Sequence, residues 1–196
     1  MPESLPRLLL EITDTLFLPC VGALIALCLL SVLQVGGVLV EAIDRWRFGG
    51  PWRALIDRLK MESAGRAGVE SLPVAFGFPE LARRELQRTP DAREKVLDDL
   101  QLRAERLLGR LSLGIRLGPM LGLAGTLIPL GPALMSLSGG EIDRLAAQLV
   151  VAFATTVIGL QVGATCYLLH AVKRHWYTQD LNDIEYVAGR TGDPDA

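Results

Sequence analysis

Three threonines attract attention because they lie in long stretches that carry no charged side chain. Thr126 lies in residues 117–140, and Thr155 and Thr156 lie in residues 145–172. A threonine hydroxyl both donates and accepts a hydrogen bond, so it can solvate either protonation state of a nearby carboxyl group. Neither stretch contains a carboxylate. These residues predict the wall of a conduit that takes its titrating group from a partner.

Each polar residue in these stretches also has an ordinary structural explanation. A threonine in a helix commonly donates its hydroxyl proton to a carbonyl one turn earlier. Gln148 and Gln161 need partners in hydrocarbon, and a hydrogen bond between helices is the more common role for such an amide. Composition alone therefore predicts an oligomeric membrane protein with polar contacts between helices.

Small residues and prolines shape the same two stretches. Proline lacks the backbone N–H group, so the three prolines of the first stretch leave carbonyl oxygens that need other partners. Glycines spaced four apart let helix backbones approach closely. The prolines are Pro119, Pro129 and Pro132, and the glycines expected to pack helices together are Gly118, Gly122, Gly125, Gly159 and Gly163.

No set of residues suited to catalysis or to metal binding is visible. Cys166 and His170 share a helix face, but two ligands do not make a metal site. No nucleophile lies near a suitable base. We therefore expect no catalytic residue, no metal, no cofactor and no enzymatic activity. The net charge of −2 likewise gives no sign of nucleic-acid binding.

The elements that carry these residues follow from hydropathy. Half of the 196 residues are apolar, and residues 15–40, 117–140 and 145–172 contain no Asp, Glu, Lys or Arg. About 20 helical residues cross a hydrocarbon core of about 30 Å, so each stretch is long enough to span a bilayer. The first is too long for the apolar part of a signal peptide, and we expect it to remain as a transmembrane helix. The sequence predicts an all-α integral membrane protein with three transmembrane helices and long cytoplasmic helical extensions.

Basic residues set the expected orientation. Lys and Arg concentrate in residues 41–116 and directly after residue 172, and such segments stay in the cytoplasm. We expect residues 1–14 outside, residues 41–116 and 173–196 in the cytoplasm, and a tight external turn at residues 138–143. Trp46, Phe48, Trp52, Trp176 and Tyr177 are expected to lie at the inner membrane boundary.

The cytoplasmic segment shows helical periodicity at its end. Apolar residues recur at helical spacing from Leu97 to Ile115. We expect one helix from about Pro90, after a start at Thr89–Pro90–Asp91, to about Leu137, and a third helix that continues to about Tyr186. These apolar stripes are expected to pack helices or subunits together. Chain breaks are expected at Gly49–Gly50–Pro51, at Ser71–Leu72–Pro73 and at Gly77–Phe78–Pro79.

Two short motifs carry a family resemblance. The residues Leu-Gly-Leu-Ala-Gly-Thr at 121–126 precede Ala-Thr-Thr-Val-Ile-Gly-Leu at 154–160 by about 30 residues. This pair resembles the MotA/TolQ/ExbB proton channel family, and the expected topology is similar to its TolQ/ExbB branch. The pore threonines of the family match Thr126 and Thr156. The branch carries a glutamate five residues before the second threonine, where this chain has Val151, and Pro129 and Pro132 are unusual for it.

The resemblance implies a function and partners. The flagellar branch also lacks that glutamate, so the resemblance still implies a proton channel, without a pore carboxylate of its own. It implies a homopentamer in the inner cell membrane, with a single-span partner similar to ExbD, TolR or MotB that brings an Asp. The chain is then expected to be the ring subunit of a motor driven by the proton-motive force, which energises transport or envelope work. The alternative is a non-conducting oligomeric scaffold that recruits cytoplasmic proteins.

Overall fold

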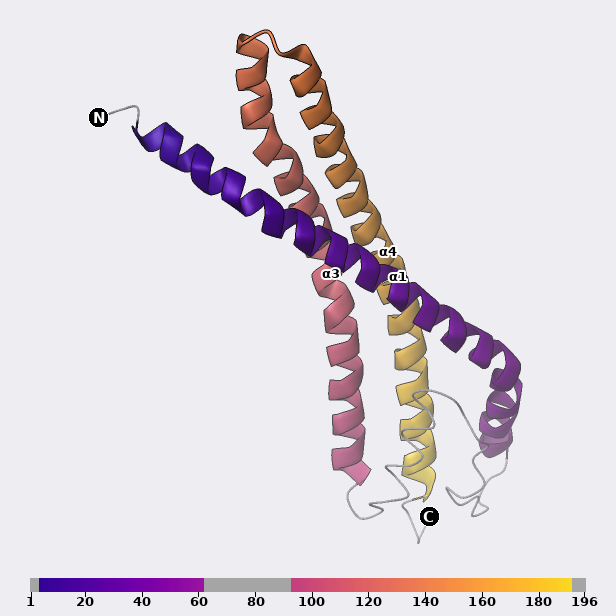
Figure 1. Ribbon diagram of the computed structural model, residues 1–196. Coiled ribbons are helices and arrows are strands. Elements are labelled where there is room, and N and C mark those ends of the chain that lie inside the picture. Colours follow the sequence, from indigo (N-terminus) through magenta and orange to yellow (C-terminus); the bar gives the residue numbers. More distant parts are fainter. Residues whose placement is uncertain (1–3, 62–92, 192–196) are drawn as a thin grey trace. The chain divides into compact units, whose positions relative to one another are not determined.

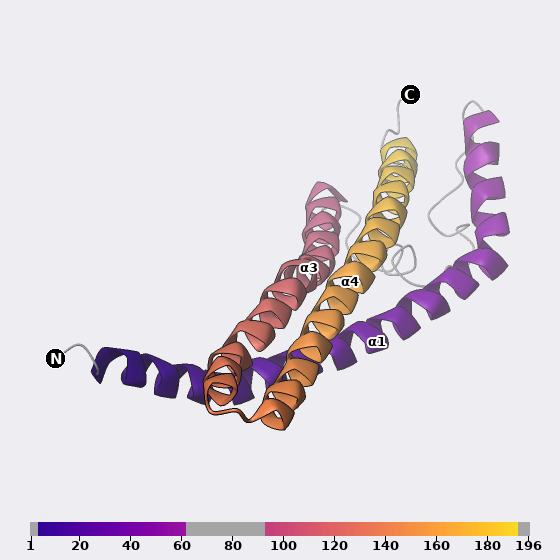
Figure 2. The ribbon, with the colours of Figure 1, turned by 90° about the horizontal axis from the view of Figure 1, so that it is seen from above.

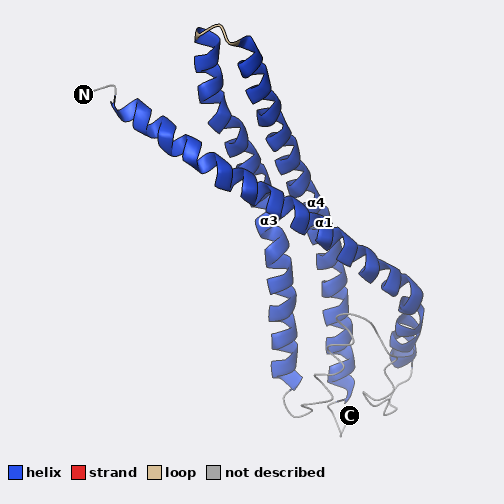
Figure 3. Cartoon of the chain, in the orientation of Figure 1, coloured by secondary structure: helices blue, strands red, loops and turns tan. Residues whose placement is uncertain are grey.

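The computed structural model describes residues 4–61 and 93–191 and places them in three long helices. These are α1 (Ser4–Met61), α3 (Arg93–Ser138) and α4 (Ile142–Thr191), and the turn between α3 and α4 is the one interruption among these residues after Arg93 (Figure 3). Within the described part of the chain, each helix is long and apolar enough to cross a membrane. The predicted all-helical fold with three helices of transmembrane length is confirmed.

The helices extend well beyond the apolar stretches that the sequence marks. The 46 residues of α3 rise about 69 Å, whereas a hydrocarbon core is about 30 Å thick. The long second helix and the continuation of the third helix past residue 172 are therefore present as predicted. The expected helix start at residues 89–91 and the turns at residues 71–73 and 77–79 lie outside the described residues.

One expected break is wrong. The backbone of α1 remains helical through Gly49–Gly50–Pro51 and ends at Met61. Proline removes one hydrogen bond and bends a helix, but the helix can continue when good helix formers follow. Residues 53–61 are rich in such residues. The ribbon of α1 changes direction in its last part instead of ending (Figure 1).

The chain divides into two compact units. Of the described residues, the first unit contains residues 4–35 and 110–169, and the second contains residues 36–61, 93–109 and 170–191. In the first unit the C-terminal half of α3 and the N-terminal half of α4 form an antiparallel hairpin, and both views show these two halves side by side (Figures 1 and 2). This hairpin carries all three threonines of interest.

The hairpin turn ends α3 with a hydrogen-bonded glycine cap. Gly140 has a φ of 78°, in the left-handed region that favours glycine. The N–H of Glu141 donates to the carbonyl of Ser136 at 2.9 Å, and the N–H of Gly140 donates to that of Leu137 at 3.1 Å. This pair of bonds is the Schellman motif, which satisfies the last carbonyls of a helix. The turn is therefore determined locally by the glycines that the sequence places there.

The second unit has a hydrophobic core between the start of α3 and the end of α4. Leu100 and Ala104 of the apolar stripe predicted for α3 are buried in it, so part of that stripe packs α3 against α4 within the chain. Tyr177 is 5% exposed and belongs to this core. Its expected depth at the inner membrane boundary stays a prediction. The buried members are Val96, Leu100, Ala104, Tyr177 and Ile184.

Candidate functional site

Backbone-to-backbone contact holds α3 and α4 together in the hairpin. A Cβ atom added to Gly118 would lie 2.8 Å from the carbonyl oxygen of Gly159, and one added to Gly159 would lie 2.8 Å from the Cα of Gly122. One added to Gly125 would lie 2.7 Å from Cβ of Thr155. Such approach is possible only without a side chain, which is the usual reason for small residues between membrane helices. We call Gly118, Gly122, Gly125, Gly159 and Gly163 the glycine interface.

Proline takes part in the same contact. A Cβ atom on Gly163 would lie 2.9 Å from Cγ of Pro119 and 3.5 Å from the carbonyl oxygen of Ile115. The carbonyl of Ile115 is the one that would have accepted the missing N–H of Pro119. In the same way Pro129 frees the carbonyl of Gly125, directly before Thr126. The prolines thus leave backbone acceptors on the helix that carries the first motif.

The three threonines differ in burial. Thr155 is 5% exposed because it packs against Gly125 in the glycine interface. Thr126 and Thr156 are half-buried and lie at the border of that interface. In the hairpin of one chain, Thr126 and Thr156 are therefore more accessible than Thr155.

All three hydroxyl groups donate to carbonyl oxygens of their own helix. Thr126 donates to Leu123 at 2.7 Å and Thr155 donates to Ala152 at 2.8 Å. Thr156 also points to the carbonyl of Ala152, but at 3.5 Å, which is beyond the usual range for such a bond. A donating hydroxyl keeps its lone pairs for another donor. The proton of Thr156 is the easiest of the three to redirect, since its bond is the weakest.

Thr126 and Thr156 lie on the same side of the hairpin. Each follows an interface residue by one position, because Thr126 follows Gly125 and Thr156 follows Thr155. One step turns about 100° around a helix. When two antiparallel helices face each other, the residue that follows a contact residue in one helix and the residue that follows a contact residue in the other point to the same side of the pair. The hairpin therefore presents two hydroxyls on one side.

Helix α1 contacts the hairpin on the other side. The thiol of Cys20 lies 3.6 Å from the carbonyl oxygen of Leu121. Leu121 precedes Thr126 by five residues and is turned from it by about 140° around α3. The side with the two threonines instead carries large exposed apolar residues, which are Leu123, Leu130, Phe153 and Leu160.

The polar amides of α4 are placed differently from each other. Gln148 is half-buried, and its Oε1 atom is buried without a hydrogen-bond partner among the described residues. Gln161 is exposed, and its Nε2 donates to the hydroxyl of Thr165 at 3.3 Å, within the same helix. Val151, at the position where the TolQ/ExbB branch has its glutamate, is 44% exposed.

A cluster of charged residues in the second unit was missed by the sequence reasoning. The guanidinium of Arg45 on α1 binds both carboxylate oxygens of Asp180 on α4, one of them at 3.0 Å. Glu41 on α1 pairs with Arg45 at 3.4 Å and with Lys173 on α4 at 3.9 Å. A signal was available, because Asp180 lies three residues after Tyr177 and four before Ile184, on the stripe that α4 buries. We call Glu41, Arg45, Lys173 and Asp180 the charge cluster.

The fold and the hairpin first define a class of protein. Three helices of transmembrane length, a tight helical hairpin and hydroxyl groups in uncharged stretches describe a polytopic membrane protein with a polar, uncharged helix pair. A model of the MotA/TolQ/ExbB proton channel family matches residues 64–185, more than half of the chain. The chain belongs to this family, as the two motifs indicated. Comparison with curated proteins and with solved structures finds no match.

Proposed function

We propose that the chain is the ring subunit of an inner-membrane motor driven by the proton-motive force. Family membership supports proton-channel function. The observation that supports placing the proton pathway on the hairpin is that Thr126 and Thr156 lie on the same side of it. In the proposed complex, five copies surround the transmembrane helices of single-span partners, and α3 and α4 line the pore. The work driven is transport or another envelope process.

The titrating group comes from the partner. Within residues 117–140 and 145–172 the chain has no carboxylate, and Val151 stands where a family branch has one. A carboxyl group in the membrane changes protonation readily only where polar groups or water solvate its charged form. An Asp on the partner helix, facing the two threonines, meets this requirement. A proton that crosses at 100 mV releases about 2.3 kcal/mol, which drives movement of the partner relative to the ring.

The hydroxyls of Thr126 and Thr156 solvate both protonation states of the partner's Asp. While Thr126 and Thr156 donate to their own carbonyls, their oxygens accept a hydrogen bond from a protonated Asp or from water. When the Asp is ionised, a hydroxyl turns its proton toward the carboxylate. The weak bond of Thr156 makes this rotation least costly there. Thr155, covered by Gly125, belongs to the proposed pathway as its least accessible member and supports the other two.

The proposed orientation follows from the basic residues. The N-terminus lies outside, and the extensions of α3 and α4 lie in the cytoplasm with the C-terminus. We propose no enzymatic activity and no resident cofactor.

Proton flux through the assembled complex tests the proposal. The chain is co-expressed with the product of a neighbouring gene that encodes one N-terminal span and an early Asp, and the complex is placed in proteoliposomes. Thr126→Ala and Thr156→Ala are each expected to lower the flux about fivefold or more, since each removes a hydrogen bond worth about 1 kcal/mol.

The control is another threonine with the same local bond. Thr178 is exposed and donates to the carbonyl of Arg174 at 2.8 Å, outside the hairpin unit. Thr178→Ala is expected to leave the flux unchanged. If Thr126→Ala and Thr156→Ala both leave flux and work unchanged, the proposed pathway is wrong.

A further inference from the structure

The charge cluster joins α1 and α4 crosswise. The acid of α1, Glu41, pairs with the base of α4, Lys173, and the base of α1, Arg45, pairs with the acid of α4, Asp180. Trp176 adds to this contact, because the guanidinium carbon of Arg45 lies 4.8 Å from the centre of its ring. The partners in each crosswise pair come from helices that are far apart in the sequence.

The cluster is largely removed from water and is electrically neutral. The side chain of Asp180 is 6% exposed, that of Lys173 is 18%, that of Glu41 is 20% and that of Arg45 is 27%. Two positive and two negative charges cancel. A buried charge without its partner is strongly unfavourable, so a shift that separates the pairs is resisted. The best-attested role of such pairs is to select one register between two elements.

The position of the cluster matches the ends of two apolar stretches. Glu41 is the first charged residue after residues 15–40, and Lys173 is the first after residues 145–172. The structure brings these two side chains together. Both stretches therefore end at a common level in this unit, which is where a membrane boundary is expected.

Hydropathy alone does not set the axial position of α1 in the membrane, so a contact with another helix is needed to set it. Its uncharged stretch of residues 15–40 rises about 39 Å, more than the roughly 30 Å of a hydrocarbon core, so hydropathy alone allows several axial positions. Only 11% of the apolar window of α1 is buried within the chain. Contact between apolar side chains and lipid does not distinguish one turn of such a helix from the next.

We propose that the charge cluster sets the axial position of α1 in the membrane by locking its register against α4. Glu41 and Arg45 thereby hold the inner end of α1 at the boundary. Without Asp180, Arg45 is drawn toward cytoplasmic water, and α1 moves inward by about one helical turn, roughly four residues. This inference rests on the membrane orientation of the proposed function and not on proton conduction.

Cysteine labelling of the full-length chain in inside-out membrane vesicles tests this inference. Cys20, Cys28 and Cys166 are replaced by alanine, and single reporter cysteines are placed at exposed positions of α1, which are Leu39, Val40, Ile43 and Trp46. A maleimide that cannot cross the membrane is added from the cytoplasmic side. With the cluster intact, the reporters at 43 and 46 are expected to react, and those at 39 and 40 to be protected.

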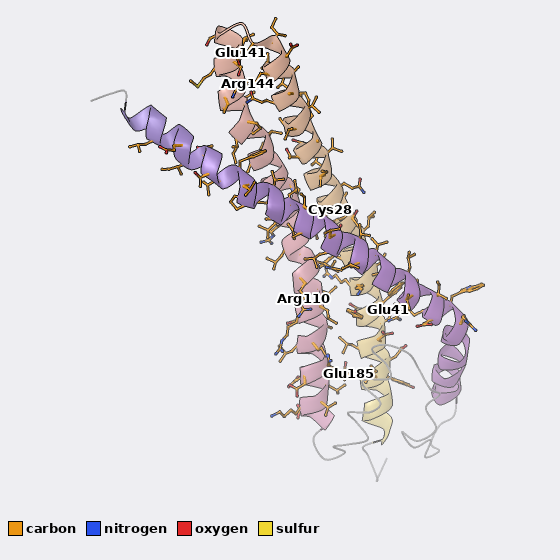
Figure 4. All side chains as sticks on the ribbon, viewed as in Figure 1. Cys28, Glu41, Arg110, Glu141, Arg144 and Glu185 are labelled. Atoms are coloured by element: carbon orange, nitrogen blue, oxygen red, sulfur yellow. The ribbon has the colours of Figure 1, made fainter. Side chains whose placement is uncertain are left out.

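Variants of Asp180 are expected to move this boundary. In Asp180→Ala, and in the milder Asp180→Asn, the reporters at 39 and 40 become reactive. The charge exchange inverts all four members of the cluster, so every pair keeps opposite signs, and it is expected to restore more than half of the protection. Its substitutions are Glu41→Lys, Arg45→Asp, Lys173→Glu and Asp180→Arg. The control is Arg144→Ala, which breaks an ion pair that does not belong to the charge cluster. Arg144 and Glu141 form this exposed pair at 3.3 Å beside the hairpin turn (Figure 4).

Two results would overturn the inference. The first is an unchanged labelling boundary in both Asp180 variants. The second is a shift that the charge exchange fails to reverse, because the register then depends on something other than charge pairing. The labelling assay does not measure proton flux, so either result leaves the proposed motor function standing. In the same way, a failed flux assay leaves the inference about α1 standing.

Discussion

At the scale of single residues, the hairpin separates three threonines that look equivalent in the sequence. Thr155 is buried against Gly125, whereas Thr126 and Thr156 are half-buried on one side of the hairpin. The hydroxyl of each donates to a carbonyl oxygen of its own helix, as is common for a threonine in a helix. This local bond does not exclude a role in a proton pathway, because the oxygen still accepts another hydrogen bond.

The hydroxyl of Thr156, and not its size, is expected to matter. Thr156→Val keeps the shape and removes the hydroxyl, so the flux through the complex is expected to fall about fivefold, equivalent to about 1 kcal/mol. Thr156→Ser keeps the hydroxyl and is expected to retain most of the flux. The measurement is the initial rate of acidification in proteoliposomes at a fixed membrane potential. Equal rates for the Val and Ser variants would argue that Thr156 acts only through packing.

At the scale of elements, the glycine interface determines how α3 and α4 form one hairpin. Gly118, Gly122 and Gly159 allow backbone contact that a single methyl group would prevent. Hydrophobic burial gives membrane helices little reason to associate, so close packing of this kind supplies the stabilisation. The interface also decides the side on which Thr126 and Thr156 emerge.

Replacing one interface glycine with alanine is expected to loosen the hairpin. Gly159→Ala would place a Cβ 2.8 Å from the Cα of Gly122, and relieving this overlap is expected to cost about 1–3 kcal/mol. The matched control is Gly109→Ala, since a Cβ at Gly109 would meet nothing within 4 Å. That control is expected to be neutral or stabilising by up to about 1 kcal/mol. Thermal unfolding in detergent, followed by circular dichroism, compares the two, and equal stabilities would contradict the tight interface.

At the scale of the whole molecule, large apolar surface remains uncovered on the side of the two threonines. Leu123, Phe153 and Leu160 are each more than half exposed there. Lipid suits the leucines and the phenylalanine, but hydroxyl groups in hydrocarbon favour a protein or water-filled neighbour. This surface is where we expect the single-span partner to pack in the assembled ring.

The mass of the complex is the prediction that belongs to this scale. Native mass spectrometry of the detergent-solubilised complex, co-expressed with the neighbouring single-span protein, is expected to give five copies of this chain with two of the partner. The control is the chain expressed alone, which is expected to form the ring and to lack the partner mass. A monomer or dimer without a partner would instead favour the non-conducting scaffold.

Hydropathy and the two motifs were enough to predict the helices and the family. Uncharged stretches of this length must become helices, because hydrocarbon offers backbone groups no other partners. The glycine pair at the hairpin turn and the two motifs are also local, so they were readable without a structure. The expected break at Gly49–Gly50–Pro51 was wrong because helix propensity beyond the proline outweighed the local signal.

Which residues of different helices face one another became visible only in the folded chain. The burial of Thr155 depends on Gly125 of the opposite helix, and the pairing of Arg45 with Asp180 joins residues 135 positions apart. Periodicity describes one helix at a time and marks its faces, but it does not state which face another helix will cover. That choice follows from complementary shape and charge between distant segments, and it is what places two hydroxyls on one side of the hairpin and a neutral charge cluster between α1 and α4.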